Sequence, residues 1–162
     1  MTSSMVNNIR PMLKPDKPAL MRILRDTPEF KPVEVEVAEE LIDAYLESPA
    51  DSGYFVLIAE SGSLAGYICY GPTPLTEGTW DIYWMAVAQD KRGHGIGGAL
   101  LKAAEVKIKE TQGRLSVIET STMLSYENTR RFYLGQGYET IAIIPDFYAP
   151  GDGKLILIKV LK

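Results

Sequence analysis

The feature that most constrains this chain is a glycine-rich turn between an apolar run and an amphipathic helix. Four glycines and one arginine fall within the seven residues from Arg92 to Gly98. Glycine lets backbone N–H groups approach an anion without a Cβ in the way, and the following helix N-terminus adds unpaired donors. Because the guanidinium of Arg92 adds two parallel donors, the turn predicts a diphosphate cradle. The alternative is a loop that only lets the helix turn sharply.

Length and composition favour one globular domain, which we expect to span residues 6–162. The chain has 162 residues, of which 46% are apolar, and these suffice for one core. A net charge of −4 lacks the basic surplus typical of nucleic-acid binding. One cysteine, Cys69, and one histidine, His94, exclude an internal disulfide and leave no zinc-site spacing. With no signal-like or membrane-spanning run, we expect a cytoplasmic protein that binds no metal, nucleic acid or membrane.

Hydrophobic periodicity predicts the helices and strands. Apolar residues at i, i+3, i+4, i+7 and i+8 over residues 38–46 indicate a helix that stops before Pro49. Other helices are expected over residues 16–26, after the glycine-rich turn, and over residues 126–134 with Ser125 as N-cap. Strands are expected at residues 6–12, 54–60, 64–70, 79–87, 115–120, 138–144 and 155–161. This order predicts an α/β domain with a mixed sheet.

The same periods assign side chains to faces. Alternation along the strand 79–87 places these residues on one face: Asp81, Tyr83, Met85 and Val87. Trp80 and Trp84 then share the opposite face. On the helix after the turn, Glu105 is expected to face solvent and to pair with Lys109 at i, i+4.

A dinucleotide is a second ligand class, because the glycines fit another fingerprint. Gly93, Gly95 and Gly98 match G-x-G-x-x-G, and Glu119 follows about 20 residues later. Three features weigh against this hypothesis. Asp90, Lys91 and Arg92 intervene between the strand and the glycines, an arginine in the cradle is not part of that fingerprint, and too few elements follow Glu119 to continue a parallel βαβ sheet.

The motif Arg92-x-x-Gly95-x-Gly97 resembles the Q/R-x-x-G-x-G/A signature of GNAT acetyltransferases. Residues 129–133, followed by a Gly-Tyr step, resemble the family's helix that ends in a tyrosine. The resemblance covers nearly the whole chain and implies a mixed, mostly antiparallel sheet of about seven strands flanked by about four helices. One position departs from the family pattern, because Tyr126 stands where many members have asparagine.

The resemblance implies acetyl-CoA as the cosubstrate. Its diphosphate would bind to the glycine-rich turn, and its pantetheine arm would enter between the splayed strands 79–87 and 115–120. A backbone N–H near Val87 would then stabilise the reacting carbonyl oxygen. In place of the usual asparagine, Tyr126 or Asn128 would contact the arm. The implied cofactor residues are Met85, Ala86, Val87, Arg92, Gly93, His94, Gly95, Ile96, Gly97, Gly98, Tyr126 and Asn128.

Acetyl transfer to an amine needs a base for the amine and an acid for the leaving thiolate. The resemblance implies Tyr133 as that acid; the alternative is an aromatic residue that fills space between helix and sheet. Asp81 is one candidate base, at a position where histone-acetylating relatives carry glutamate, or else it caps the strand end or pairs with a cation. Glu119 is the other candidate, or else a structural carboxylate bound to backbone or to Arg130.

The expected activity is transfer of an acetyl group from acetyl-CoA to a primary amine by direct attack in a ternary complex. A non-catalytic acyl-CoA-binding module of the same fold is the alternative. Small-molecule and peptide amines both stay open as acceptors, and relatives imply a homodimer as one expected assembly. Loops are expected at residues 28–32 and 145–153. Tyr148 and Asp152 in the second loop would touch the acceptor, unless this loop is only a hairpin connection.

Overall fold

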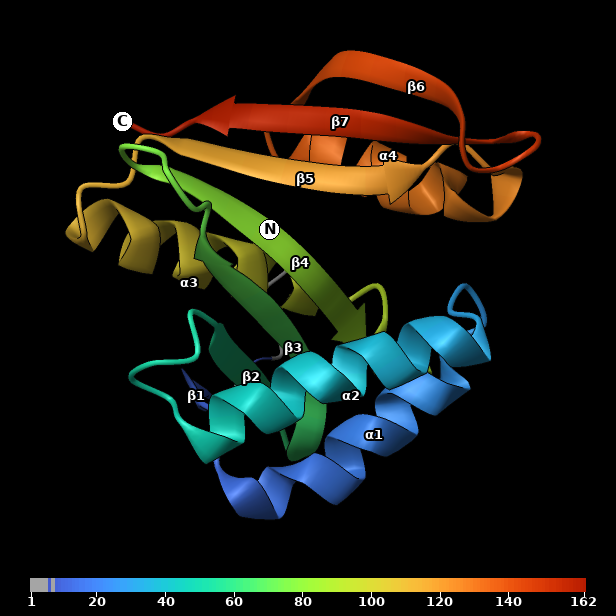
Figure 1. The fold of residues 1–162 in the computed structure, drawn as a ribbon. Coiled ribbons are helices and arrows are strands. Elements are labelled where there is room, and N and C mark those ends of the chain that lie inside the picture. Colours follow the sequence, from blue (N-terminus) through green and yellow to red (C-terminus); the bar gives the residue numbers. More distant parts are fainter. Residues whose placement is uncertain (1–5, 7) are drawn as a thin grey trace.

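The computed structural model describes residue 6 and residues 8–162 as a seven-stranded sheet with helices on both faces (Figure 1). The strands are β1 (Asn8–Pro11), β2 (Phe55–Ser61), β3 (Ser63–Pro72), β4 (Thr79–Val87), β5 (Leu115–Ser121), β6 (Glu139–Ala149) and β7 (Asp152–Val160). The helices are α1 (Lys17–Asp26), α2 (Pro32–Glu47), α3 (Ile96–Glu110) and α4 (Glu127–Gly135). The expected α/β fold is confirmed. Asn7, within the expected first strand, lies outside the described residues.

Every strand pairing is antiparallel except the one between β4 and β5. The order across the sheet is β1-β2-β3-β4-β5-β7-β6. The parallel pairing runs only from Thr79 opposite Leu115 to Ile82 opposite Ile118. Beyond it both strands continue, β4 as far as Val87, without pairing to each other, and Figure 1 shows them diverging. The sheet therefore opens between its two central strands.

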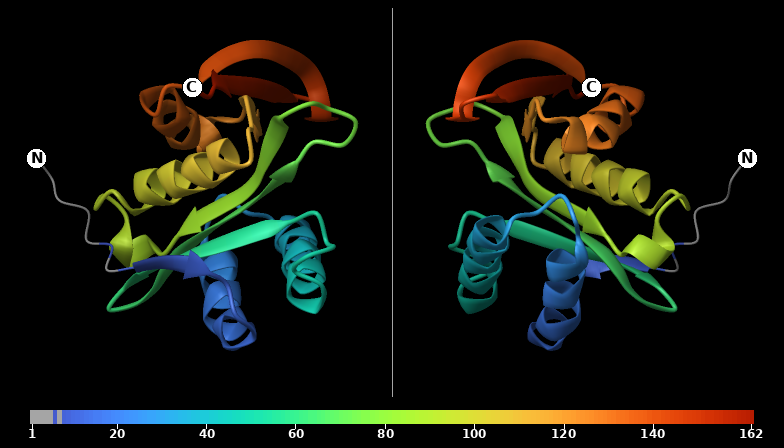
Figure 2. Two further views of the ribbon diagram at one scale, coloured as in Figure 1. Left: turned by 90° about the vertical axis from the view of Figure 1, so that its left-hand side faces the viewer. Right: turned by 90° about the vertical axis from the view of Figure 1, so that its right-hand side faces the viewer.

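Two hydrophobic cores lie on opposite faces of the sheet (Figure 2). The core beneath α1 and α2 contains the fully buried Leu20, Ile42 and Tyr67. The core beneath α3 and α4 contains Leu100 and Leu157. Burial of one leucine or isoleucine side chain contributes about 2 kcal/mol to stability, so these cores hold the helices on the sheet. None of the helices in residues 8–162 is long and apolar enough to span a bilayer.

A β-bulge in β4 changes which side chains share a face. Ile82 and Trp84 lie opposite consecutive residues of β3, so Tyr83 between them is an extra residue. The alternation of faces shifts by one at such a bulge. Trp80 packs into the core beneath α3, whereas Trp84 packs against the core beneath α1 and α2. The prediction that the two tryptophans share a face is wrong.

For the same reason, Asp81 does not share a face with Met85 and Val87. Both of these residues pack against the core beneath α3, as do Trp80 and Ile82 before the bulge. Asp81 lies between Trp80 and Ile82 in the sequence, so its side chain points to the opposite face, toward α1 and α2. The predicted shared face is wrong because a period of two was carried through the bulge.

Three element boundaries also differ from prediction. α2 begins at Pro32, because a proline in the first helical turn needs no hydrogen-bonded N–H. β6 continues to Ala149, so most of the predicted loop 145–153 is strand. Ser125 is not the N-cap of α4. It lies inside a 3-10 turn that ends at Tyr126, and Tyr126 occupies the cap position without a side-chain cap bond.

Glu105 of α3 is buried, so its expected exposure and its pairing with Lys109 are wrong. Its carboxylate accepts hydrogen bonds from Nζ of Lys159 at 2.8 Å and from Oη of Tyr138 at 3.0 Å. The hydroxyl groups of Tyr138 and Ser116 lie 2.8 Å apart. This network joins α3 to β5 and β7, and an i, i+4 rule does not detect it because Lys159 is 54 residues away.

We expect the substitution Glu105→Ala to lower the free energy of unfolding by about 2 kcal/mol, because it leaves an ammonium and a hydroxyl group without their buried acceptor. Urea denaturation measures the change. The control is Glu110→Ala, which removes an exposed glutamate of the same helix and should change stability by less than about 0.5 kcal/mol. Equal losses in the two variants would contradict a stabilising role of the network.

Candidate active site

α3 begins at the glycine-rich turn, and its N-terminus presents a run of unpaired backbone N–H groups. Gly93 and the N-cap Gly95 have φ angles of 81° and 79°, in the left-handed region that glycine adopts without a Cβ penalty. The amide of Ala99 donates to the carbonyl of Gly95. Among the described residues, none accepts a hydrogen bond from the amides of residues 93–98. These amides are therefore free to bind an anion, and we call residues 93–98 the cradle.

Arg92 precedes the cradle and is held by two protein groups. Its Nη1 and Nη2 donate to Oε1 and Oε2 of Glu29 at 3.2 and 3.3 Å. Its Nε lies 3.4 Å from the carbonyl oxygen of Val87, the last residue of β4. Glu29 belongs to the segment between α1 and α2, 63 residues earlier in the chain. Sequence reasoning did not single out this partner.

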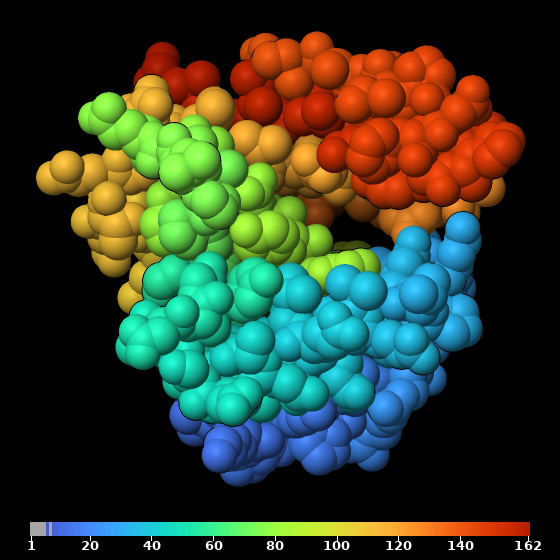
Figure 3. All heavy atoms as spheres, in the orientation of Figure 1, coloured from blue at the N-terminus to red at the C-terminus, as the bar shows by residue number. Residues whose placement is uncertain are grey.

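A cleft of about 1120 Å³ includes the cradle and the gap between β4 and β5. Figure 3 shows the surface hollowed between the α1–α2 segment and the C-terminal strands. Of the residues predicted to bind the cofactor, the following line the cleft: Met85, Ala86, Val87, Arg92, Gly93, Gly95, Ile96, Gly97, Gly98, Tyr126 and Asn128. His94 is exposed and does not line it.

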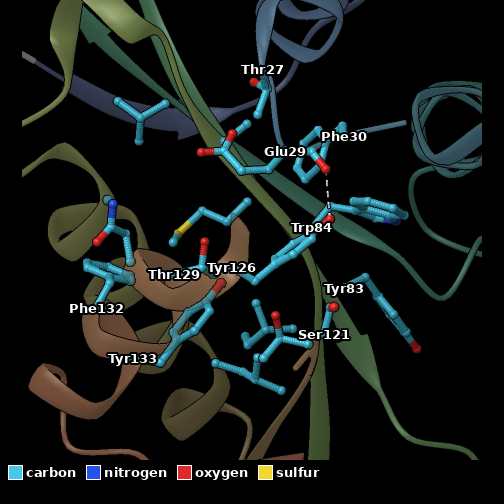
Figure 4. A pocket seen from close by; sticks show the side chains of 18 of the residues that line it. Thr27, Glu29, Phe30, Tyr83, Trp84, Ser121, Tyr126, Thr129, Phe132 and Tyr133 are labelled. Atoms are coloured by element: carbon cyan, nitrogen blue, oxygen red, sulfur yellow. Dashed lines mark hydrogen bonds between the residues drawn. The ribbon is translucent and has the colours of Figure 1, made fainter. Parts of the chain in front are cut away.

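Tyr133 of α4 is the buried phenol of the cleft. The residue is 6% exposed, and its ring packs edge-on against the rings of Phe132 and Tyr138. Figure 4 shows its side chain among the residues that surround the pocket. Burial raises the pKa of this phenol, which keeps it protonated at neutral pH. None of the described residues is hydrogen-bonded to its hydroxyl, so the hydroxyl can donate to a ligand.

Asp81 lines the same cleft. Its Oδ2 accepts a hydrogen bond of 2.7 Å from Oγ1 of Thr73, just beyond the end of β3. Burial and the nearby charge of Asp81 raise the pKa of the bulged Tyr83 to about 12. Among the described residues, Asp81 forms no ion pair, so the predicted pairing with a cation is not observed; its partner is a neutral hydroxyl group beside the cleft.

Glu119 lines the cleft from the diverging end of β5. Its Oε2 forms an ion pair of 2.9 Å with Nζ of Lys154. The predicted partner Arg130 instead donates to the backbone carbonyl groups of Ser121 and Met123, both at 2.8 Å. Arg130 therefore fixes the connection between β5 and α4, and Lys154 of β7 is the cation that neutralises Glu119.

Tyr148 and Asp152, which come from the β6–β7 hairpin, also reach the cleft. Asp152 is 9% exposed and accepts a hydrogen bond of 2.5 Å from Oγ of Ser121. Burial and the charges of Glu119 and Asp152 raise the pKa of Tyr148. Residues from β5, β6 and β7 are thus brought together at one end of the cleft.

Tyr126 reaches across the cleft to the α1–α2 segment. Its hydroxyl donates to the carbonyl oxygen of Glu29 at 3.0 Å, and lies 3.3 Å from Oε2 of Glu34 (Figure 4). Burial, together with the charge of Glu34, raises the pKa of Tyr126. The structure therefore places Tyr126 as a bridge between α4 and the α1–α2 segment. Asn128 lines the cleft two residues further along the chain.

One group of cleft residues that sequence reasoning missed comes from the α1–α2 segment and the start of α2. The residues of this group are Thr27, Glu29, Phe30, Lys31, Val33, Glu34 and Val37. The ring of Phe30 meets the ring of Trp84 edge-on at 5.4 Å, which holds the segment against β4. No local motif marks these residues, since only the packing of α1 and α2 on the sheet brings them to the cleft.

Neither a metal site nor a reactive cysteine is supported in the described part of the chain. Within residues 6 and 8–162, no group of three His, Cys, Asp or Glu side chains is placed to hold a metal ion. Cys69 is buried, and burial raises the pKa of its thiol to about 12, as suits a core residue.

The dinucleotide hypothesis is wrong for this fold. A dinucleotide-binding domain needs a run of parallel strands, whereas one pairing of this sheet is parallel and the others are antiparallel. The family model described as the acetyltransferase (GNAT) family matches residues 17–138. The chain belongs to the GNAT family of acetyltransferases.

Individual relatives agree with this assignment. A Desulfovibrio desulfuricans protein, described as an acetyltransferase of the GNAT family, is 41% identical, with a TM-score of 0.91 over 96% of this chain and 99% of that one. An uncharacterized N-acetyltransferase of Methanocaldococcus jannaschii is 31% identical over 108 residues, which span 65% of each protein and so just under two thirds of the relative. An aminoglycoside 6'-N-acetyltransferase complexed with coenzyme A shares the fold, with a TM-score of 0.74 at 18% identity over 96% of this chain and 97% of that one.

We expect Gly95→Ala to lower the free energy of unfolding by about 1 kcal/mol, because alanine must then adopt a left-handed backbone conformation. Gly98→Ala is the matched control. Gly98 lies inside α3, where alanine is favoured, and the added Cβ would meet the flexible side chain of Gln136 at 3.4 Å. Urea denaturation should therefore show a loss for the first variant only. A Gly95→Ala protein as stable as wild type would contradict the left-handed cap.

Proposed function

We propose that this protein is an acetyl-CoA-dependent N-acetyltransferase, which moves an acetyl group to a primary amine by direct attack in a ternary complex. The observation that carries the proposal is the combination of three features along one cleft. They are the free amides of residues 93–98, the unpaired edges of β4 and β5, and the buried hydroxyl of Tyr133. A CoA ester has groups that match these features: a diphosphate, an amide-containing arm and a thioester.

The cradle would bind the diphosphate, because a helix N-terminus favours negative charge. Arg92 would supply a fixed cation beside it. The pantetheine arm would enter between β4 and β5 and hydrogen-bond with the backbone of residues 85–87, as an added strand does. The aminoglycoside acetyltransferase that shares this fold was crystallised with coenzyme A, which supports a CoA ester as the ligand.

In the proposed reaction, the amine nitrogen attacks the thioester carbonyl carbon, so that a C–N bond forms and the C–S bond breaks. A backbone N–H near Val87 would stabilise the negative charge that develops on the carbonyl oxygen. Tyr133 would donate its proton to the leaving thiolate. The phenol is protonated at neutral pH and so has a proton to give, which Tyr133 would regain from solvent after the thiol leaves. The proton released by the amine would return to solvent through a carboxylate.

The carboxylate would be Asp81 or Glu119, which line the cleft from its two diverging strands. Asp81 is short, so a relaying water is expected between it and the amine. Glu34 and Asp152 add two further carboxylates to the lining, besides Glu29, which is paired with Arg92. This acidic surrounding favours a cationic amine as the acceptor, whether a small molecule or a peptide.

The first test is a thermal-shift comparison. A ligand that binds only the folded state stabilises it by about 2.7 kcal/mol at a concentration of 100 times its Kd. Acetyl-CoA should therefore raise the melting temperature, and NAD, added as the control, should leave it unchanged. A shift with NAD and none with acetyl-CoA would refute the proposed ligand.

The second test is release of free CoA thiol from acetyl-CoA with a panel of amines. With an amine that supports turnover, Tyr133→Phe should lower kcat about 100-fold, because the thiolate loses its acid. The KM for acetyl-CoA should change little. Tyr54→Phe removes a hydroxyl outside the cleft and keeps the ring that meets Tyr83, so its kcat should equal that of wild type.

Asp81→Asn and Glu119→Gln extend this series, and we expect one of them to lower kcat far more than the other. If acetyl-CoA binds but no amine in the panel releases thiol, the non-catalytic acyl-CoA-binding module is the better description. Unchanged turnover in the Tyr133 variant would remove that residue from the chemistry.

A further inference from the structure

Arg92 already has an anionic partner in this protein. Both terminal nitrogens of its guanidinium donate to the carboxylate of Glu29, at 3.2 and 3.3 Å. Burial opposes ionisation of Glu29, yet the hydrogen bonds and the charge of Arg92, together with a backbone hydrogen bond, outweigh burial and lower the pKa of the carboxyl. Glu29 is therefore an anion at neutral pH. It occupies the two parallel donors that a phosphate would use.

The backbone on both sides of Glu29 is anchored, so the carboxylate is held toward Arg92. The carbonyl oxygen of Glu29 accepts the hydrogen bond of 3.0 Å from Tyr126. The next residue, Phe30, packs edge-on against Trp84 with ring centres 5.4 Å apart. Figure 4 shows Glu29 and Phe30 next to each other at the pocket, with the Tyr126 side chain directed toward them. The ion pair thus belongs to a packed segment that spans the cleft.

The backbone amides of the cradle differ from the guanidinium of Arg92 in whether another group of the protein already binds them. The amides of residues 93–98 have no partner among the described residues, whereas the guanidinium is occupied. A diphosphate bound to these amides brings negative charge beside the carboxylate of Glu29. Like charges repel, so the carboxylate must give up the guanidinium or share it.

We propose that Glu29 sets the affinity of the cradle for its cofactor, and that a cofactor phosphate takes its place at Arg92 on binding. This inference rests on the proposed function, because it requires a ligand that carries a diphosphate. One charge-assisted pair is broken for the pair that forms, so Arg92 contributes less to affinity than a free arginine would. The exchange also makes the contribution of Arg92 to binding specific for ligands that carry phosphate, since a ligand without phosphate leaves the Glu29–Arg92 pair intact.

The test compares Glu29→Gln with wild type by isothermal titration of CoA. Removing the competing charge should lower the Kd for CoA about twofold to fivefold, which is the upper part of the range expected for a partly exposed charged pair. Glu34→Gln is the matched control. It removes the same charge from the same cleft, at a carboxylate that contacts Tyr126 and not Arg92, and its Kd should change less than about twofold.

Pantetheine, which has no diphosphate, is the ligand control. Its Kd, followed by NMR chemical shifts, should be the same for Glu29→Gln and wild type. An unchanged or weaker affinity of Glu29→Gln for CoA would overturn the exchange, and so would an equal gain in Glu34→Gln or with pantetheine. If wild type and both variants fail to bind CoA, the proposed function itself fails. If all three proteins bind CoA equally well, only the role of Glu29 fails.

Discussion

The one parallel pairing of the sheet, between β4 and β5, decides where the rest of the site lies. Pairing ends at Ile82 and Ile118, and the two strands then diverge, as the twist of a sheet allows when no strand fills the gap. A short 3-10 turn (Gln89–Lys91) joins the end of β4 to the glycine-rich turn, so the N-terminus of α3 borders the same opening. The N-terminus of α3 can therefore bind an anionic group of a ligand, and the adjacent gap between β4 and β5 can take an extended arm of the same ligand.

Charge is arranged to match this geometry. Backbone donors and Arg92 gather where β4 ends, whereas carboxylates from α2, β4, β5 and β7 line the remainder of the cleft. In the proposed reaction, the first set would attract the anionic cofactor and the second a cationic acceptor. The phenol of Tyr133 is buried and protonated at neutral pH. This separation of charge would draw each substrate to its own part of the site.

The α1–α2 segment links these two sets of groups. Glu29 meets Arg92 on one side, and its carbonyl oxygen meets Tyr126 on the other. Tyr126 stands where many relatives have an asparagine, and the larger side chain reaches a segment that the amide group of asparagine could not. The departure from the family pattern therefore has a structural consequence, because it ties α4 to the segment whose Glu29 is paired with Arg92.

The sequence alone determined the features that depend on residues close to one another in the chain. The bounds of β4, the glycine-rich turn, the start of α3 and the presence of Tyr133 on a short helix were all predictable, because strand period, glycine φ and helix capping act over a few residues. Only the tertiary structure decided the bulge at Tyr83, which moved Asp81 to the other face, and the burial of Glu105 against Lys159. The same holds for the pairing of Glu29 with Arg92. These contacts join residues 54 and 63 positions apart, and no local pattern encodes such a partner, because packing of whole helices on the sheet brings it within reach.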